Sequence, residues 1–272
     1  MKVSCLQFDV HFGDPAANLQ AVRGALAEAC VKGVDLVITP EAFLTGYVVG
    51  NEQDARNLAL KGALRAEMLE EGQALAEKYA VHLILGYIEE DPASKHIYNS
   101  ATLFAPGEKP RTYRKMHLPV LGVDRFATPG EELEVFDTPF GKIGIIICFD
   151  LRVPEAARTL ALKGADLIVL PTNWPEGAEL TPVHFMPVRA AENRVFMAAC
   201  NRVGTEHGTT FIGHSMIVDP DMKILAEGGK GVEVLEADLD LSEARQKTRV
   251  VIPGEYETNT FSTRQPKAYS AT

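Results

Sequence analysis

The chain has 272 residues, of which 46% are hydrophobic and 24% charged, a composition typical of globular proteins with a large buried core. Its formal net charge is −10 and its isoelectric point is near 5.2, which argues against nucleic acids and anionic membrane surfaces as partners. No apolar run approaches the roughly 20 residues that span a bilayer, and Gln7 and Asp9 interrupt the N-terminus where a signal peptide would be apolar. We therefore expect a cytoplasmic protein with reduced thiols.

The hydrophobic pattern predicts strands and helices that alternate along most of the chain. In the first half it predicts two helices, three strands and a hairpin-like pair around Pro106-Gly107, in the order strand 3–9, helix 16–32, strand 34–38, helix 62–79, strand 81–88, and strands 99–104 and 110–115. The second half continues with strand 143–148, helix 154–163, strand 166–170, helix 184–194, strand 195–201, several strands over 210–238, and a short helix at 241–249. We find no linker or change of composition, so we expect one domain over 1–272, with a polar, extended tail at 253–272.

Two segments of the chain resemble each other. Residues 32–40 and 163–171 both read Lys-Gly, a small residue, Asp, an apolar run and Pro, and each follows an Ala-rich helical segment. Each is typical of a helix that ends at Gly and leads into a buried strand. Strands that are this apolar and alternate with helices predict an α/β fold in which helices cover the sheets.

Three of the apolar strands are followed by residues that could do chemistry. They are followed by Glu41, by Cys148 and by Asn173-Trp174. Ligands of α/β sheets bind beyond the carboxyl ends of the strands. If these ends lie side by side, a carboxylate, a thiol and an amide converge on one pocket.

Cys148 lies where an apolar strand gives way to a helix, and helix starts offer free N–H groups and a partial positive charge that favour a thiolate. The alternative is a structural cysteine, since free cysteines are among the most buried residues. The other three, Cys5, Cys30 and Cys200, are expected in the core. No CxxC pair is present, and no metal site is expected.

A thiol nucleophile needs a proton acceptor, for which the sequence offers histidine or glutamate. His184 and His214 are the better-placed histidines, near predicted element starts. Glu41 could serve if burial raises its pKa, and Lys115 could stabilise the negative charge that develops on a carbonyl oxygen. Taken singly, Glu41 could equally cap a turn, and Lys115 could lie on a solvated face.

Three blocks of sequence together resemble a known family. Pro40-Glu41-Ala42-Phe43, then 114–119 (Arg-Lys-Met-His-Leu-Pro), then 148–155 around Cys148-Phe149-Asp150 resemble, in this order, the motif blocks of the nitrilase superfamily of carbon–nitrogen hydrolases. The resemblance extends over about residues 2–252. It implies a four-layer α-β-β-α sandwich, with subunits paired as a homodimer or higher homo-oligomer and the tail at 253–272 as a candidate interface segment.

The resemblance also implies roles for single residues. It implies Cys148 as nucleophile, Glu41 as general base and Lys115 as the group that stabilises the tetrahedral oxyanion, with the Phe149 backbone N–H as a second donor. Many members carry a further glutamate between the lysine and cysteine blocks. Here Asp124 is the nearest carboxylate, which either takes that place or pairs with Arg125 or caps a turn.

The expected reaction is hydrolysis of a small aliphatic amide or ω-amide to a carboxylic acid and ammonia, without metal or organic cofactor. Nitrilases of the family have Trp after the cysteine, whereas this chain has Phe149, so an N-carbamoyl substrate is the first alternative and a nitrile the second. A non-catalytic scaffold is the alternative from another class. The residues expected to contact the substrate are Tyr47, Asn173 and Trp174 as pocket lining, and Arg152 and Arg189 as binders of an acid group. The arginines could instead form internal ion pairs, and Trp174 could pack in the core.

Overall fold

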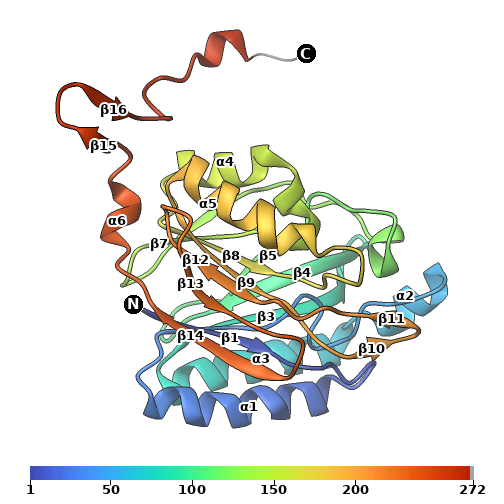
Figure 1. Cartoon of the computed structure of the whole chain (residues 1–272). Coiled ribbons are helices and arrows are strands. Elements are labelled where there is room, and N and C mark those ends of the chain that lie inside the picture. The colour runs from blue at the N-terminus through green and yellow to red at the C-terminus, as the bar shows by residue number, and fades with distance from the viewer. Residues whose placement is uncertain (270–272) are drawn as a thin grey trace.

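Two six-stranded β-sheets face each other at the centre of the computed structural model, which describes residues 1–269 (Figure 1). The first sheet has the order β14-β1-β2-β3-β4-β5 and is made of β1 (Lys2–Gln7), β2 (Leu36–Ile38), β3 (His82–Glu90), β4 (Ile97–Phe104), β5 (Arg111–Arg114) and β14 (Glu233–Asp238). The second has the order β13-β12-β9-β8-β7-β6 and is made of β6 (Val135–Asp137), β7 (Lys142–Ile145), β8 (Leu167–Pro171), β9 (Phe196–Cys200), β12 (Met216–Val218) and β13 (Ile224–Glu227). The central strands β1-β2-β3 and β7-β8-β9 are parallel, and the flanking strands are antiparallel.

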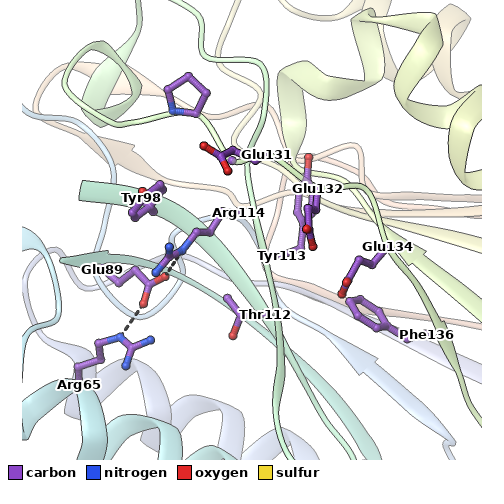
Figure 2. A pocket seen from close by; sticks show the side chains of 12 residues that line it. Arg65, Glu89, Tyr98, Thr112, Tyr113, Arg114, Glu131, Glu132, Glu134 and Phe136 are labelled. Carbon is purple, nitrogen blue, oxygen red and sulfur yellow. Dashed lines mark hydrogen bonds and ion pairs between the residues drawn. The ribbon is translucent and has the colours of Figure 1, made fainter. Parts of the chain in front are cut away.

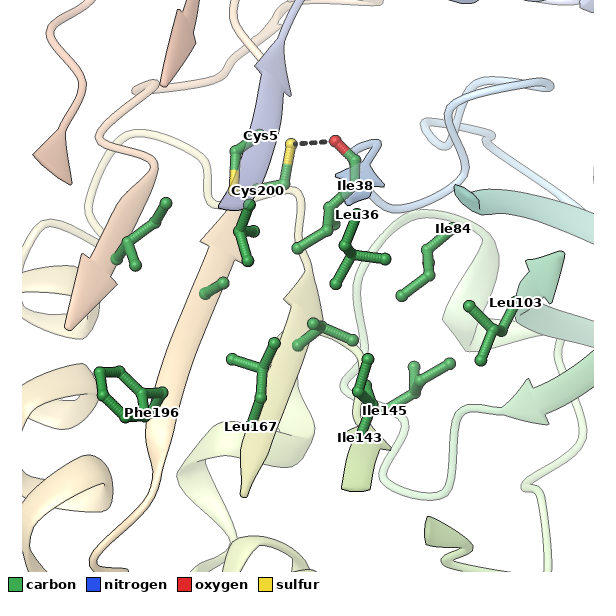
Figure 3. Close-up of a cluster of buried hydrophobic side chains, with 14 of the residues drawn as sticks. Cys5, Leu36, Ile38, Ile84, Leu103, Ile143, Ile145, Leu167, Phe196 and Cys200 are labelled. Atoms are coloured by element: carbon green, nitrogen blue, oxygen red, sulfur yellow. Dashed lines mark hydrogen bonds between the residues drawn. The ribbon is translucent and has the colours of Figure 1, made fainter. Parts of the chain in front are cut away.

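The main core lies between the two sheets (Figure 3). Leu36 and Ile84 of the first sheet and Ile145 and Leu167 of the second are fully buried in one cluster. Burial of each such aliphatic side chain contributes about 1.5–3 kcal/mol. The apolar runs that predicted buried strands are therefore the inner faces of the two sheets.

Helices cover both outer faces, which completes a four-layer α-β-β-α sandwich (Figure 1). The first sheet is covered by α1 (Pro15–Val31) and α3 (Gly62–Tyr79), and the second by α4 (Pro154–Leu162) and α5 (Met186–Asn193). The expected fold class is confirmed. Within residues 1–269, no helix is long and apolar enough to cross a membrane.

The two similar segments of sequence have the same structural role, one in each sheet. Asp35, before β2, accepts a hydrogen bond from the Lys2 backbone N–H at 2.7 Å, and its own N–H donates to Lys2 O at 2.9 Å. Asp166, before β8, makes the same pair of bonds with Lys142, at 3.0 and 2.8 Å. Each Asp therefore fastens the start of its strand to the neighbouring parallel strand. The repeated motif is a packing device shared by the two halves.

Several elements differ from the sequence prediction. Helix α2 (Glu52–Leu58) was not predicted because only Ala55 of its side chains is buried, so it carries no apolar stripe, although the Asn51 side chain caps it by accepting from Asp54 N at 2.9 Å. The helix expected at 184–194 is α5, preceded by a π-helical turn, η3 (Thr181–Phe185). The strand expected at 143–148 ends at Ile145, since Cys148 begins a 3₁₀ helix, η2 (Cys148–Arg152).

The C-terminal part is also more folded than predicted. The helix expected at 241–249 is reduced to α6 (Ser242–Arg245), and the next residues form β15 (Arg249–Ile252). Strand β15 pairs with β16 (Tyr256–Thr258), so the tail that we expected to be extended contains half of a hairpin and a last helical turn, η4 (Pro266–Ala268). The hairpin projects beyond the sandwich (Figure 1). Three short elements complete the chain: η1 (Gly122–Arg125), β10 (Thr205–Glu206) and β11 (Thr209–Thr210).

Candidate active site

Glu41 lies in a turn that follows β2, and its side chain is buried. The next residue, Ala42, has a φ of +51°, a left-handed conformation that is uncommon for residues other than glycine. The turn packs directly against Gly86 of β3, where a Cβ atom would lie only 2.3 Å from Pro40 O. The Glu41 N–H donates to Thr172 O at 3.4 Å, which joins the turn to the second sheet. Glu41 is thus held by contacts from both sheets.

Lys115 follows the edge strand β5, and its backbone N–H donates to Asn99 O of β4 at 2.8 Å. Its ammonium group is fully buried and donates to Glu41 Oε1 at 2.7 Å and to Asp124 Oδ2 of η1. The structure therefore brings three of the predicted residues into one ion-pair cluster. Asp124 does not pair with Arg125, whose guanidinium instead lies 5.1 Å from the centre of the Phe126 ring.

Two neutral side chains complete this cluster. The Asn99 amide donates to Glu41 Oε1 at 2.7 Å and to Asp124 Oδ1 at 2.9 Å. The Tyr47 hydroxyl lies 2.9 Å from Asp124 Oδ2 and 3.1 Å from Leu121 O. Asn99 was missed by the sequence analysis, because nothing in the strand sequence indicates that its side chain faces Glu41.

Burial and charge set the protonation of the cluster. Loss of solvation raises the pKa of Glu41 above its usual value, and the nearby Asp124 raises it further, although Lys115 opposes both effects. Burial disfavours the charged form of Lys115, but the carboxylates of Asp124 and Glu41 outweigh it and hold the pKa of Lys115 well above its usual range. The site therefore combines a permanent cation with a carboxylate whose basicity is increased.

Cys148 is a half-buried residue at the start of η2, with a φ of +47°. Such a conformation is costly for a residue with a side chain and is often found at functional sites. The pKa of its thiol is raised to about 12, chiefly by loss of solvation and also by the charge of Glu41. Lys115 and the Asn173 backbone N–H act in the opposite direction without overcoming these effects. The prediction that the helix start favours a thiolate is therefore wrong for the resting protein, in which the Cys148 thiol is protonated near neutral pH.

Several buried polar atoms next to Cys148 have no hydrogen-bond partner among the described residues. They are Glu41 Oε2 and both amide atoms of Asn173. A buried polar group without a partner costs free energy unless a ligand or water satisfies it. These atoms mark the inner end of a site that is able to bind a polar group.

A cavity of about 310 Å³ opens beside the Cys148 thiol. Its walls come from the loop after Lys115, from η2 and from the segment after β8, and the lining residues are Pro119, Leu121, Cys148, Phe149, Arg152, Trp174, Pro175, Glu176, Gly177, Ala178 and Thr181. Of the predicted substrate-contacting residues, Trp174 and Arg152 line this cavity. Two charged side chains, Arg152 and Glu176, reach it, and the structure shows no ion pair for either within residues 1–269.

Comparison with known proteins settles the family. The family model described as carbon–nitrogen hydrolase matches residues 2–249. The chain belongs to the carbon–nitrogen hydrolase family. Among curated relatives, this hydrolase is 35% identical to a nitrilase of Pyrococcus abyssi, with 91% of this chain and 92% of the relative covered. It is 31% identical to a 2-oxoglutaramate amidase of Bacillus subtilis, with 90% and 92% covered.

A solved relative gives the same assignment for the fold and the enzyme class. A cysteine-to-alanine mutant of an amidase from Nesterenkonia sp. AN1, in complex with butyramide, superposes on this hydrolase with a TM-score of 0.80, at 26% identity, covering 90% of this chain and 93% of the other. A mutant of that amidase carries acrylamide, joined by Michael addition, at its active-site cysteine, with a TM-score of 0.80 at 25% identity and 91% and 96% covered. The chain is therefore an enzyme that hydrolyses carbon–nitrogen bonds other than peptide bonds.

The remaining predicted residues lie outside the cavity of this hydrolase. Arg189 is buried, donating to Leu151 O at 3.0 Å and to Glu192 at 2.9 Å, which is the internal pairing that we considered as its alternative. Tyr47 contacts Asp124 instead of the cavity. Asn173 is buried behind the thiol, and Trp174 both lines the cavity and packs in the core of the second sheet.

The two histidines that we considered as bases are also elsewhere. His184 is exposed on η3, and His214 lies 3.6 Å from Glu227. Neither side chain lines the cavity. Among residues 1–269, no group of three or more His, Cys, Asp and Glu side chains could hold a metal ion.

A second cavity, of about 380 Å³, lies at the edge strand β5 and contains none of the predicted site residues (Figure 2). The buried Glu89 accepts hydrogen bonds from Arg65 at 2.6 Å and from Arg114 at 2.9 Å. The Arg114 guanidinium also lies 3.8 Å from the centre of the Tyr98 ring. Because Glu89 and its two arginines satisfy one another, the residues within 1–269 that line this cavity present no unpaired buried charge.

Proposed function

We propose that this hydrolase converts small ω-amides of carboxylic acids to the acid and ammonia, through a thioester on Cys148. The observation that carries the proposal is the position of a buried carboxylate, Glu41, and a buried ammonium, Lys115, beside a thiol that is protonated near neutral pH. A neutral thiol is a weak nucleophile and needs an adjacent base to become reactive. Glu41 supplies that base, and no histidine is required.

In the first step, Sγ of Cys148 attacks the amide carbon while Glu41 takes the thiol proton. The C=O π bond opens, and the negative charge that forms on oxygen is stabilised by the Lys115 ammonium and the Phe149 N–H. That N–H lies in the first turn of η2, where helix geometry leaves N–H groups without acceptors inside the helix. The C–N bond then breaks, protonated Glu41 gives its proton to the leaving nitrogen, and ammonia departs.

In the second step, water attacks the thioester carbon while Glu41 accepts one of its protons. The second oxyanion is stabilised by the same donors, the C–S bond breaks, and the sulfur regains its proton from Glu41. The carboxylic acid leaves, and the starting state of the enzyme is restored. Besides the amide substrate, water is the only reactant that the two steps require.

Asp124 has an electrostatic role in this proposal. It lies against Lys115 on the side shared with Tyr47, and its charge raises the pKa of Glu41. We assign to it the place of the second family glutamate, as the group that holds Lys115 in position and keeps Glu41 basic. Tyr47 and Asn99 fix the orientation of its carboxylate.

Arg152 favours an ω-amide over a simple aliphatic amide. It is an exposed cation on the wall of the cavity, and its guanidinium lies 5.0 Å from the centre of the Phe185 ring. Guanidinium groups bind carboxylates through two parallel hydrogen bonds. A substrate with its amide at Cys148 and a carboxylate at the other end would satisfy both ends of the cavity. The 2-oxoglutaramate amidase relative is named for a substrate of this kind.

A panel of substrates tests the proposal. Ammonia release would be measured for the half-amide of glutaric acid, for butyramide, for a ureido acid and for butyronitrile. We expect the highest kcat/KM for the half-amide. A higher kcat/KM for the ureido acid would assign the N-carbamoyl reaction instead, and a higher value for the nitrile would assign the activity for which the Pyrococcus abyssi relative is named.

We also propose that the enzyme is a cytoplasmic homodimer. Exposed apolar side chains lie on η3, on α5 and on the tail hairpin: Val183, Val188, Val250, Val251, Ile252 and Tyr256. The tail contacts the α4–α5 layer at Phe261, whose ring lies 5.1 Å from the Arg158 guanidinium, and its hairpin projects beyond that layer (Figure 1). Light scattering in solution should give twice the chain mass of 29.6 kDa, and a monomeric mass would refute the dimer.

A further inference from the structure

Asp150 links the two segments that carry Cys148 and Lys115. It lies two residues after Cys148 in η2 and is fully buried. Its Oδ2 accepts from the Ile147 N–H at 2.9 Å and from the Tyr113 hydroxyl at 2.7 Å.

The other oxygen, Oδ1, serves a single residue, His117. It accepts from the His117 backbone N–H at 2.9 Å and lies 2.7 Å from His117 Nδ1. Tyr113 and His117 stand on either side of Lys115 in the sequence, at the end of β5 of the first sheet, whereas Ile147 and Cys148 follow β7 of the second sheet. The Asp150 carboxylate thus accepts hydrogen bonds from residues on both sides of Lys115 in the sequence and from Ile147, the residue directly before Cys148.

We propose that Asp150 and His117 are positioning residues that keep the Lys115 ammonium and the Cys148 thiol in register across the two sheets. The proposal rests on the function proposed above, because it gives Lys115 and Cys148 their roles. A carboxylate offers about four lone-pair sites, and four donors fill them here. An asparagine would have a single oxygen and would direct an N–H₂ group at two of the donors.

Among the residues that donate hydrogen bonds to Asp150, His117 is the one whose side chain is partly exposed to solvent. Its side chain is 29% exposed, and its hydrogen bond to Asp150 raises its pKa above the usual value, against the opposing effect of burial. Glu155 at the start of α4 is the other charged group that acts on it, in the same direction. The protonated imidazole makes a charge-assisted bond, which is about twice as strong as a neutral one. As the pH rises through the raised pKa of His117, the link weakens, and turnover should decrease.

The test compares His117→Asn, His117→Leu and Asp150→Asn with the native enzyme. An asparagine at 117 can keep a donor near the position of Nδ1 but does not titrate. His214→Asn is the matched control, because His214 is also a half-exposed histidine beside a carboxylate, but that carboxylate is Glu227 of β13 and not Asp150. We would measure kcat and KM from pH 5 to pH 10 with the half-amide of glutaric acid.

We expect His117→Leu to lower kcat roughly tenfold or more near pH 7, with a smaller deficit at alkaline pH and little change in KM. His117→Asn should restore kcat near pH 7 and remove the alkaline decrease that the native enzyme shows. Asp150→Asn, if folded by circular dichroism, should lose on the order of 10²-fold in kcat. A native alkaline decrease that persists in His117→Asn, or a kcat for His117→Leu equal to that of the native enzyme, would overturn the proposal.

A second measurement separates this proposal from the proposed function. The rate of alkylation by chloroacetamide at Cys148 would be followed by peptide mass mapping over the same pH range, with the exposed Cys30 as internal reference. An enzyme without amide turnover refutes the proposed function, but the positioning proposal still requires slower alkylation at Cys148 in His117→Leu. Equal alkylation rates at Cys148 in that variant and in the native chain would refute the positioning role by itself.

Discussion

Replacement of Gly86 by alanine should disable the site although it replaces no residue that reacts. Gly86 is in the middle of β3, and an added Cβ would lie 2.3 Å from Pro40 O, 2.9 Å from Ala42 N and 3.1 Å from Glu41 Cα. Contacts between carbon and a carbonyl oxygen settle at about 3.3–3.6 Å, so the turn that carries Glu41 must move by roughly 1 Å. The atoms in contact are backbone, which cannot give way by a change of rotamer.

A displacement of about 1 Å at a catalytic group can cost on the order of 10² in rate. We therefore expect kcat of Gly86→Ala to decrease about 100-fold, and the free energy of unfolding to decrease by about 1–3 kcal/mol, as in other overpacked cores. The assay is ammonia release per mole of folded enzyme, with unfolding followed by urea denaturation. Gly24→Ala in α1 is the control, since a Cβ there meets no atom within 4 Å. A Gly86→Ala enzyme with native kcat would refute the argument that this glycine positions Glu41.

Three further predictions concern charge. Lys115→Met should lower kcat about 10²–10³-fold, because it removes a cation that stabilises the oxyanion. It should also lower the melting temperature, because it leaves the buried Glu41 and Asp124 without their shared cation. A kcat within threefold of the native value would contradict the oxyanion role. The base must be ionised and burial raises the pKa of Glu41, so activity should fall as the pH drops through that raised pKa. Asp124→Asn removes one negative neighbour of Glu41, and the acid limb of its rate profile should therefore move to lower pH. An unchanged acid limb would exclude Glu41 as the titrating base. Arg152→Gln should raise KM about tenfold for the half-amide of glutaric acid and leave butyramide unaffected, whereas equal effects on both substrates would refute carboxylate binding.

The apolar runs predicted most of the inner strands and an α/β fold with helix-covered sheets, because these runs are buried and end at Gly, Pro or polar residues. The four-layer sandwich followed from the family resemblance. The resemblance also predicted that Glu41, Lys115 and Cys148 belong to one site, since each lies in a short motif that can be read directly from the sequence. Asn99 could not be predicted, because its role depends on which strand lies beside β5 and on which face its side chain points. The same holds for Asp150, because two of its three partner residues, Tyr113 and His117, come from the end of the opposite sheet.

The errors of the sequence analysis have physical causes as well. Helix-start logic predicted a thiolate at Cys148, but loss of solvation and the charge of Glu41 dominate at this position and keep the thiol protonated. Arg189 looked available for a substrate because one of its acceptors, Leu151 O, belongs to η2 and lies 38 residues away in the sequence. Its other acceptor, Glu192, is three residues further along the same helix and was readable from the sequence as the internal ion pair. The local sequence shows neither how well a side chain is solvated in the folded protein nor which distant residues contact it.

The most direct test of the central claim is the capture of the acyl-enzyme. Native enzyme and Cys148→Ala would be mixed with the half-amide of glutaric acid, quenched in acid during turnover and examined by intact mass and peptide mapping. We predict a glutaryl group, attached as a hydroxylamine-sensitive thioester, on the peptide that contains Cys148, and neither adduct nor ammonia release with Cys148→Ala. Ammonia release by Cys148→Ala at the native rate, or an adduct on another cysteine, would contradict the account.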